Sequence, residues 1–125
     1  MPAAPPSAPA PVWPIAIAET LVWASCYYTF AGLLPAWEAD LGLGRGLLVG
    51  AMTMALLVSA ALGPLAGAVV DRGHGRGLLA GGAIIGAAGL VLLATVTGAA
   101  GFYVAWFLLG VAMAASAYEP AFALL

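Results

Sequence analysis

Four long apolar runs, separated by short breaks, constrain this chain more than any other feature. They cover residues 14–34, 47–70, 78–97 and 102–122. About 20 consecutive apolar residues span the hydrocarbon core of a bilayer as an α-helix. Strands are shorter than these runs, and in lipid they leave backbone groups unpaired unless they close into a barrel. The sequence therefore predicts an all-α membrane protein with four transmembrane helices.

The composition supports the same class. Hydrophobic residues make up 65% of the chain and charged residues 6%, with no lysine, asparagine or glutamine. Soluble domains carry roughly 25% charged residues, so we expect the lipid bilayer to be this chain's main partner. The net charge of -2 argues against nucleic acid. The single cysteine, Cys26, excludes a disulfide framework or a thiol metal cluster within the chain.

The N-terminal segment differs from the rest. Residues 1–14 hold six of the nine prolines, interleaved with alanine. Such a stretch has no apolar periodicity, so we expect 1–13 to be a disordered Pro/Ala-rich tail and 14–125 to form the helical domain. A secretory signal needs basic residues ahead of a shorter apolar core, and the tail has none. We expect the tail to be retained.

The breaks between the runs indicate how the helices cross the membrane. The first, 35–46, carries one basic residue, the second carries Arg72 and Arg76, and the third is a tight turn at 98–101. Short breaks imply antiparallel neighbours. The excess of basic residues places 71–77 in the cytoplasm. The N-terminus is then cytoplasmic too, and we expect a plasma membrane of the bacterial inner-membrane type.

Small residues recur at helical spacing in the second and third runs. In the second run the stripe comprises Gly46, Gly50, Thr53, Leu57, Ala60, Pro64, Gly67 and Asp71. A stripe of small residues lets a neighbouring backbone approach closely. In the third run, Gly77 pairs with Gly81, and Gly82 with Gly86 on a different face. We therefore expect the stripe to be the packing face of the second helix, and the third helix to have neighbours on two sides.

The break after the second run combines glycines with charges. Gly67 lies one turn before Asp71, Arg72 follows directly, and Gly75-Arg76 opens the next run. Glycines permit a sharp return into the third helix. A carboxylate at this position can bind the positive N-terminus of an adjoining helix, or an arginine, in one conformation and release it in another.

This break resembles the signature loop between the second and third helices of major facilitator superfamily transporters. That loop reads glycine, two to three apolar residues, Asp, Arg, any residue, Gly, Arg and a further basic residue. The residues that match are Gly67, Asp71, Arg72, Gly75 and Arg76. This chain departs from the pattern in one extra residue at 73–74 and in Gly77, which replaces the last basic residue. The likeness extends over residues 13–125 in helix order and loop placement.

The resemblance implies a fold and a function. Transporters of this family have twelve helices in two halves and work by alternating access, and this chain would supply the first four helices. By resemblance, Asp71 helps to hold one face closed, and Arg72 and Arg76 lie at the cytoplasmic boundary away from the substrate. We expect secondary active transport of a small solute by a longer carrier. As an N-terminal fragment, the chain would not transport alone.

The first run contains an acid, which is unusual in lipid. A charged residue at the centre of a membrane helix costs about 2.5 to 3.5 kcal/mol on insertion scales. Glu19 shares an arc with Trp23, Cys26 and Phe30, with Tyr27 at its edge. Two interpretations stay open. This face lines a cavity for substrate or protons, or Glu19 is an interfacial acid beside an aromatic belt.

A second acid lies in the fourth run. Glu119 precedes Pro120, and Ser116 shares its helical face. If the first and fourth helices adjoin, Glu19 and Glu119 could both face a central cavity. No cation lies within a run to pair with either acid. A carboxyl group that holds its proton in such a cavity would support proton-coupled transport.

The sequence bears on three other possible functions. A small four-helix multidrug exporter acting as a dimer also needs one acid in its first helix, and an inert membrane assembly subunit needs only its glycine stripes. An enzyme is not expected, because the runs contain no histidine and no cluster of metal ligands. We expect no cofactor and no metal. The substrate stays open among organic anions, amphipathic drugs and cationic metabolites.

Overall fold

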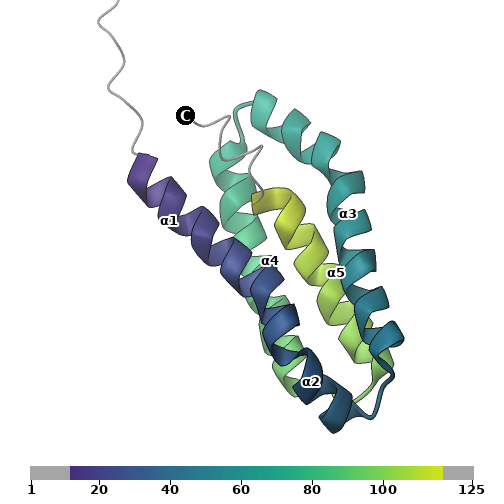
Figure 1. The fold of residues 1–125 in the computed structure, drawn as a ribbon. Coiled ribbons are helices and arrows are strands. Elements are labelled where there is room, and N and C mark those ends of the chain that lie inside the picture. The colour runs from purple at the N-terminus through teal and green to yellow at the C-terminus, as the bar shows by residue number, and fades with distance from the viewer. Residues whose placement is uncertain (1–11, 117–125) are drawn as a thin grey trace, which may run out of the picture.

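The computed structural model describes residues 12–116, and Figure 1 shows them as helices joined by short turns. The elements in chain order are α1 (Val12–Trp23), the π-helical turn η1 (Ala24–Tyr28), α2 (Thr29–Leu41), α3 (Arg45–Asp71), α4 (Gly75–Thr95) and α5 (Ala99–Ser116). Residues 12–116 contain no strand. The predicted all-α class is therefore confirmed for this part of the chain.

The first helix is longer than the sequence predicted. The elements α1, η1 and α2 follow one another without a break, and Pro35 lies inside α2. The expected loop from Pro35 is wrong, because the buried side chain of Trp37 anchors the segment as a helix despite the hydrogen bond that proline removes. The helix ends at Gly42, whose φ of 62° is left-handed. At the other end it already includes Val12 and Trp13, while residues 1–11 lie outside the description.

Three helices, α3, α4 and α5, are long and apolar enough to cross a membrane. Large apolar side chains also cover their outer faces, as at Leu57, Leu65, Ile84, Val91 and Phe107. This architecture fits an integral membrane protein built from helices, since water would penalise such a surface. The first helix divides into segments of 12 and 13 residues around the π turn. That it crosses the membrane as a fourth span stays a prediction.

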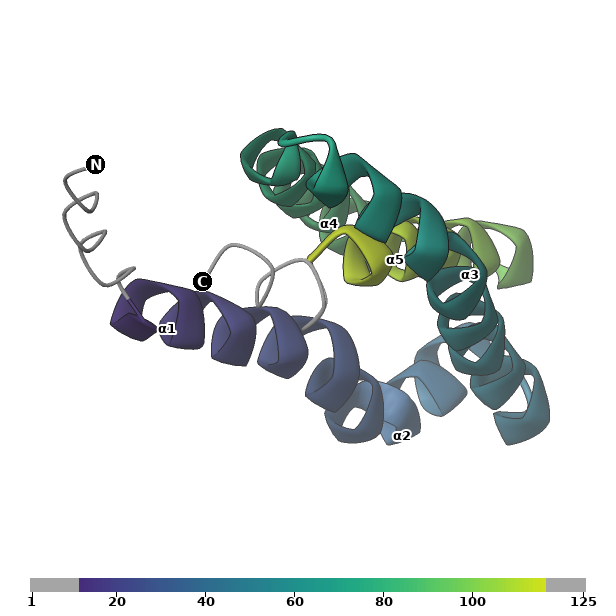
Figure 2. The ribbon, with the colours of Figure 1, turned by 90° about the horizontal axis from the view of Figure 1, so that it is seen from above.

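The central element is α5. Figure 2 shows it between α3 and α4, with α1 on the opposite side from α4. Its buried residues are Phe102, Ala105, Trp106, Leu109, Gly110, Ala112, Met113, Ala114, Ala115 and Ser116. The expected glycine pair Gly82 and Gly86 packs against it: a β-carbon on Gly82 would lie 2.7 Å from the β-carbon of Ala115. At Gly77 and Gly81 a β-carbon would meet nothing within 4 Å, so α4 uses one of its two glycine faces here.

The packing face of α3 differs from the predicted one. Its buried residues are Leu48, Ala51, Met52, Ala55 and Ala66. They lie on the side opposite the predicted stripe, most of which is exposed. The predicted packing face of α3 is therefore wrong for its contacts with the described helices. Ala51 and Ala55 also give α3 a narrow face, and that face packs against Gly110 of α5. A β-carbon on Gly110 would lie 2.6 Å from the carbonyl oxygen of Ala55.

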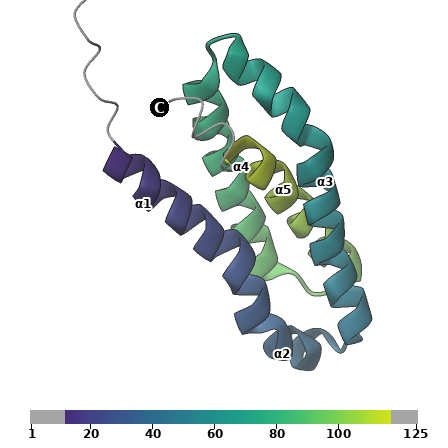
Figure 3. The same cartoon turned by 45° about the horizontal axis from the view of Figure 1, so that its top comes forward.

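An aromatic cluster fastens the first helix to α5. It consists of Phe30, Trp37, Phe102 and Trp106. The ring centroids of Phe30 and Trp106 are 5.2 Å apart, and those of Trp37 and Phe102 5.1 Å, both edge to face. Such geometry adds about 0.5 to 1.5 kcal/mol per pair beyond burial. The cluster lies toward the α2 end of the bundle, whereas α1 contains no buried residue and leans outward in Figure 3.

Candidate functional site

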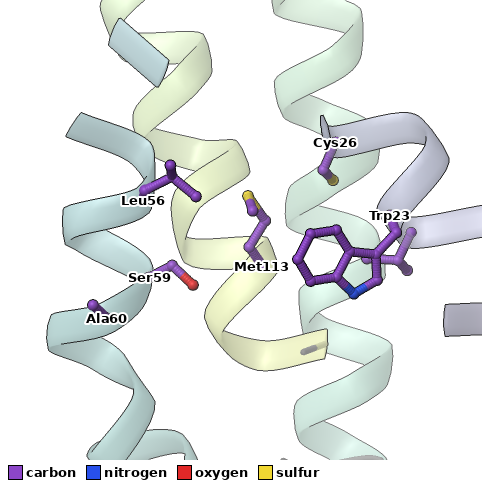
Figure 4. Close-up of a pocket in the computed structure, with 7 residues that line it drawn as sticks. Trp23, Cys26, Leu56, Ser59, Ala60 and Met113 are labelled. Atoms are coloured by element: carbon purple, nitrogen blue, oxygen red, sulfur yellow. The ribbon is translucent and has the colours of Figure 1, made fainter. Parts of the chain in front are cut away.

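A pocket of about 220 Å³ lies where the first helix faces α3 and α5. Its lining consists of Val22, Trp23, Cys26, Leu56, Ser59, Ala60 and Met113. In Figure 4 the indole ring of Trp23 extends toward the side chain of Met113, and the Ser59 hydroxyl extends from α3 toward the same space. The lining is apolar apart from this hydroxyl, the indole N–H and the thiol. It can enclose a small organic group.

Glu19 lies one helical turn before Trp23 on the pocket-facing side of α1, about 6 Å along the axis. The residue is half-buried. Its Oε2 atom is fully buried and accepts no hydrogen bond from residues 12–116. A buried carboxylate oxygen without a partner costs free energy, so this oxygen favours either a bound proton or a cation brought by a ligand.

The π-helical turn η1 borders the pocket. Cys26 lies inside it, 5% exposed, and the Thr29 hydroxyl donates to the carbonyl oxygen of Ala24 at 3.4 Å. Single π turns within α-helices occur frequently at functional sites, because they rotate side chains out of the regular register. Here the turn separates the pocket-lining part of the first helix from the part that enters the aromatic cluster.

The predicted acid and aromatic face is divided among different surroundings. Trp23 and Cys26 line the pocket, and Glu19 lies one turn away. Phe30 belongs to the aromatic cluster instead. Tyr27 is 41% exposed, with its ring centroid 5.5 Å from that of Trp23. Of the residues that the sequence pattern grouped on this face, Trp23 and Cys26 line the pocket, and Phe30 and Tyr27 do not.

The contributions of α3 and α5 to the pocket were missed. Ser59 offered a signal, since it is one of two hydroxyl residues in the second apolar run. Ser116, which sequence analysis placed with the cavity, packs on α4: its Oγ lies 2.6 Å from where a β-carbon on Gly82 would stand. Glu119 lies outside the described residues.

The signature-like loop is remote from the pocket. Asp71, Arg72 and Arg76 are exposed, and none of them forms an ion pair within residues 12–116. Asp71 ends α3, about 16 Å along the helix axis from Ala60. A β-carbon on Gly67 would have no atom within 4 Å. The close approach of a neighbouring helix expected at Gly67 is therefore not made by the described helices.

The extra residue in this loop has a structural role. Gly73 has a φ of 83°, in the left-handed region. Its N–H donates to the carbonyl oxygen of Val70 at 2.8 Å, and the N–H of His74 donates to that of Val69 at 3.2 Å. This pair of bonds is the Schellman motif, which ends a helix and satisfies its last carbonyls. The buried Gly75 then begins α4.

Replacing Gly73 by alanine should therefore destabilise the protein. A β-carbon in the left-handed region costs about 1 to 2 kcal/mol. Gly77→Ala is the matched control, because Gly77 is helical and a β-carbon there meets nothing within 4 Å. We expect thermal denaturation in detergent to give a lower midpoint for Gly73→Ala and an equal or higher one for Gly77→Ala. Equal midpoints for the two variants would contradict the assigned turn.

An ion pair links α2 to the start of α3 at the opposite end of the bundle. The Nε of Arg45 donates to Oε1 of Glu38, and Nη2 donates to Oε2, both at 3.0 Å. This two-point contact holds the pKa of the Glu38 carboxyl below its usual value, chiefly through the hydrogen bonds from Arg45. The pair bridges the turn that contains Gly42.

The lowered pKa predicts an acid-sensitive contribution to stability. A carboxyl with a lower pKa in the folded state stabilises the protein above its unfolded pKa and loses that effect as pH falls through the folded value. The melting temperature of the parent should therefore fall more than that of Glu38→Gln between about pH 5 and pH 3. All other acids are present in both proteins, so their effects cancel in the difference between the two melting temperatures. Parallel pH profiles would show that the pair contributes nothing in solution.

The fold and the site together define a class, a helical protein with the features of a membrane protein and an apolar pocket between three helices. Beside the pocket lies an acid whose Oε2 atom accepts no hydrogen bond from residues 12–116. Within residues 12–116, no group of three or more His, Cys, Asp or Glu side chains could hold a metal ion. The chain matches no known family model, no curated protein and no solved structure with which it was compared.

Proposed function

We propose that this chain forms part of a proton-coupled secondary transporter of the major facilitator type, embedded in a plasma membrane with its N-terminus in the cytoplasm. The observation that carries the proposal is the buried Oε2 of Glu19, without a hydrogen-bond partner in the described part, one turn from the pocket. A membrane acid beside a pocket can bind a proton in one state and release it in another, which couples solute binding to the proton gradient.

The loop after α3 supports the same proposal. Its Asp71 and Arg72 stand at a helix end, exposed and without ion pairs among residues 12–116. In a complete carrier this pair would contact the second half of the protein in one conformation and separate from it in the other. The loop would then control access, while the pocket binds the solute.

The exposed side of α3 fits a carrier with further helices. Gly46, Thr53 and Pro64 are exposed there, on a side of α3 that carries no buried residue. Small residues on such a face allow close packing of another helix in lipid. We propose that the remaining helices of a longer carrier cover it. Alternating access would then move this half against the other around the pocket.

Transport can be tested directly with the complete protein in lipid vesicles. A pH gradient is imposed, and accumulation is measured for three radiolabelled solute classes: organic anions, amphipathic cations and neutral metabolites. We expect one class to accumulate above protein-free vesicles, and a protonophore that collapses the gradient to abolish this accumulation.

Each other outcome overturns part of the proposal. Accumulation that survives the protonophore would reject proton coupling but keep transport. No accumulation of any class, with protein shown to be folded and inserted, would reject transport and favour a membrane assembly subunit.

A further inference from the structure

We propose that the pocket between η1, α3 and α5 binds a soft monovalent metal ion, Cu(I), between the thiol of Cys26 and the thioether of Met113. The inference goes beyond the proposed function, because it assigns a ligand to the pocket and does not depend on proton coupling. A single cysteine excludes a cluster of thiols within this chain, but it is compatible with a mixed site of one thiol and one thioether. The structure brings such a pair together.

Two sulfur-containing side chains from different helices line the pocket. Cys26 belongs to η1 and Met113 to α5, and both are buried, with 5% and 7% of their surface exposed. Figure 4 shows both sulfur atoms beside the same space, one carried by the first helix and the other by α5. The two residues are far apart in the sequence, so no local geometry requires them to meet. The fold therefore supplies two soft donors to one cavity.

The kind of donor selects the kind of ion. Thiolate and thioether ligands favour Cu(I), whereas carboxylate, carbonyl and water ligands suit magnesium, calcium and manganese. Among the described residues that line the pocket, none is His, Asp or Glu, and the one hydroxyl is that of Ser59. A hard cation would therefore find too few oxygen ligands to replace its water shell. The two sulfur atoms suit a soft ion.

The charge of this complex matches an apolar pocket. The Cys26 thiol gives up its proton to the solvent when the copper–sulfur bond forms, so one thiolate holds one monovalent ion. The thioether of Met113 is neutral, and the complex therefore has no net charge. An uncompensated charge is costly to bury among apolar side chains such as Val22 and Leu56, and a neutral complex avoids that cost. A divalent ion on the same two donors would remain positively charged.

The pocket also has room for the two sulfur atoms to close on the ion. Its volume of about 220 Å³ exceeds that of a bare metal ion. Methionine is unbranched, and its flexible side chain adapts to irregular spaces. The thioether of Met113 can therefore move toward Cys26 by rotation of its own bonds, while α5 keeps its place between α3 and α4.

Copper uptake tests the site without any transport measurement. The complete protein in detergent is titrated with the coloured complex of Cu(I) and bicinchoninate, and ascorbate keeps the copper reduced. The loss of colour gives the amount of Cu(I) transferred to the protein. We expect the parent to take up one equivalent more than Cys26→Ser and Cys26→Ala, whose titrations account for any other copper sites of the complete protein. Melting temperatures of both variants show that they remain folded.

Met113→Leu tests the second sulfur atom. Leucine has nearly the volume of methionine, so this variant should fold like the parent. Loss of a group that merely supports a ligand already lowers metal affinity about tenfold or more, so loss of the ligand itself should weaken the Cys26-dependent binding of Cu(I) at least as much. Met54→Leu is the matched control, because Met54 lies in α3 and does not line the pocket. It should keep the parent affinity.

Three results would overturn the inference. Equal copper uptake by the parent and both Cys26 variants would show that this residue binds no Cu(I). A parent-like affinity of Met113→Leu would show that Cys26 binds copper as any thiol does, without the thioether. Displacement of the Cys26-dependent copper by an equal concentration of Zn²⁺ would reject the selection of a soft monovalent ion. These results do not depend on the vesicle assay, so this site and proton-coupled transport stand or fall separately.

Discussion

Replacing Gly110 by alanine should strongly reduce the amount of folded protein. A β-carbon at this position would lie 2.6 Å from the carbonyl oxygen of Ala55 and 2.9 Å from its α-carbon. These are backbone atoms, which cannot rotate away as a side chain can. The central helix α5 would have to separate from α3, and overpacking of this kind costs about 1 to 3 kcal/mol or more. We expect less monodisperse protein after detergent extraction and a lower melting temperature.

Gly32→Ala is the matched control for this prediction. Gly32 lies in α2, is exposed, and has nothing within 4 Å of where a β-carbon would stand. Alanine favours a helix over glycine by about 1 kcal/mol, so this variant should equal or exceed the parent in stability. If Gly110→Ala is as stable as Gly32→Ala, the crossing of α3 and α5 is not as close as described.

Replacing Glu19 by glutamine should reduce proton-driven solute accumulation by about tenfold or more, while the protein still folds. Glutamine keeps the size and polarity of the side chain but cannot take up or release a proton. Because Oε2 of Glu19 has no partner among residues 12–116, its replacement removes no hydrogen bond that these residues make to this oxygen. We therefore expect the melting temperature to equal or exceed that of the parent.

The controls for Glu19→Gln separate charge from folding. Glu38→Gln removes a second glutamate, which lies in the ion pair with Arg45 and not beside the pocket. This variant should keep the parent rate of accumulation. Ser59→Ala removes the hydroxyl of the pocket wall and should change the apparent affinity for the solute more than the maximal rate, since it leaves Glu19 in place. Parent-like accumulation by Glu19→Gln would remove this residue from the mechanism.

The sequence predicted the helices well because lipid leaves few alternatives. Apolar runs of about 20 residues must satisfy their backbone hydrogen bonds internally, so helices at α3, α4 and α5 followed from length and composition. Helical periodicity also placed Trp23 and Cys26, four and seven positions after Glu19, on one face, and both line the pocket. These predictions depend only on local geometry.

Predictions that depended on neighbours were less successful. Two narrow faces of α3 were equally regular in the sequence, and the choice between them depends on Gly110, which lies about 55 residues further along the chain. Pro35 indicated a loop, but the burial of Trp37 keeps that segment helical. The role of Gly73 required its φ angle, which composition does not reveal. Tertiary contacts decided each of these cases.

The central claim is that solute movement through this protein is coupled to protons at Glu19. The most direct test uses the complete protein in vesicles that contain a pH-sensitive dye. A gradient of the solute that accumulates in the transport assay is imposed without a pH gradient. We predict that the internal pH changes with the parent and stays constant with Glu19→Gln. A constant pH with the parent, or an equal change with both proteins, would contradict the claim.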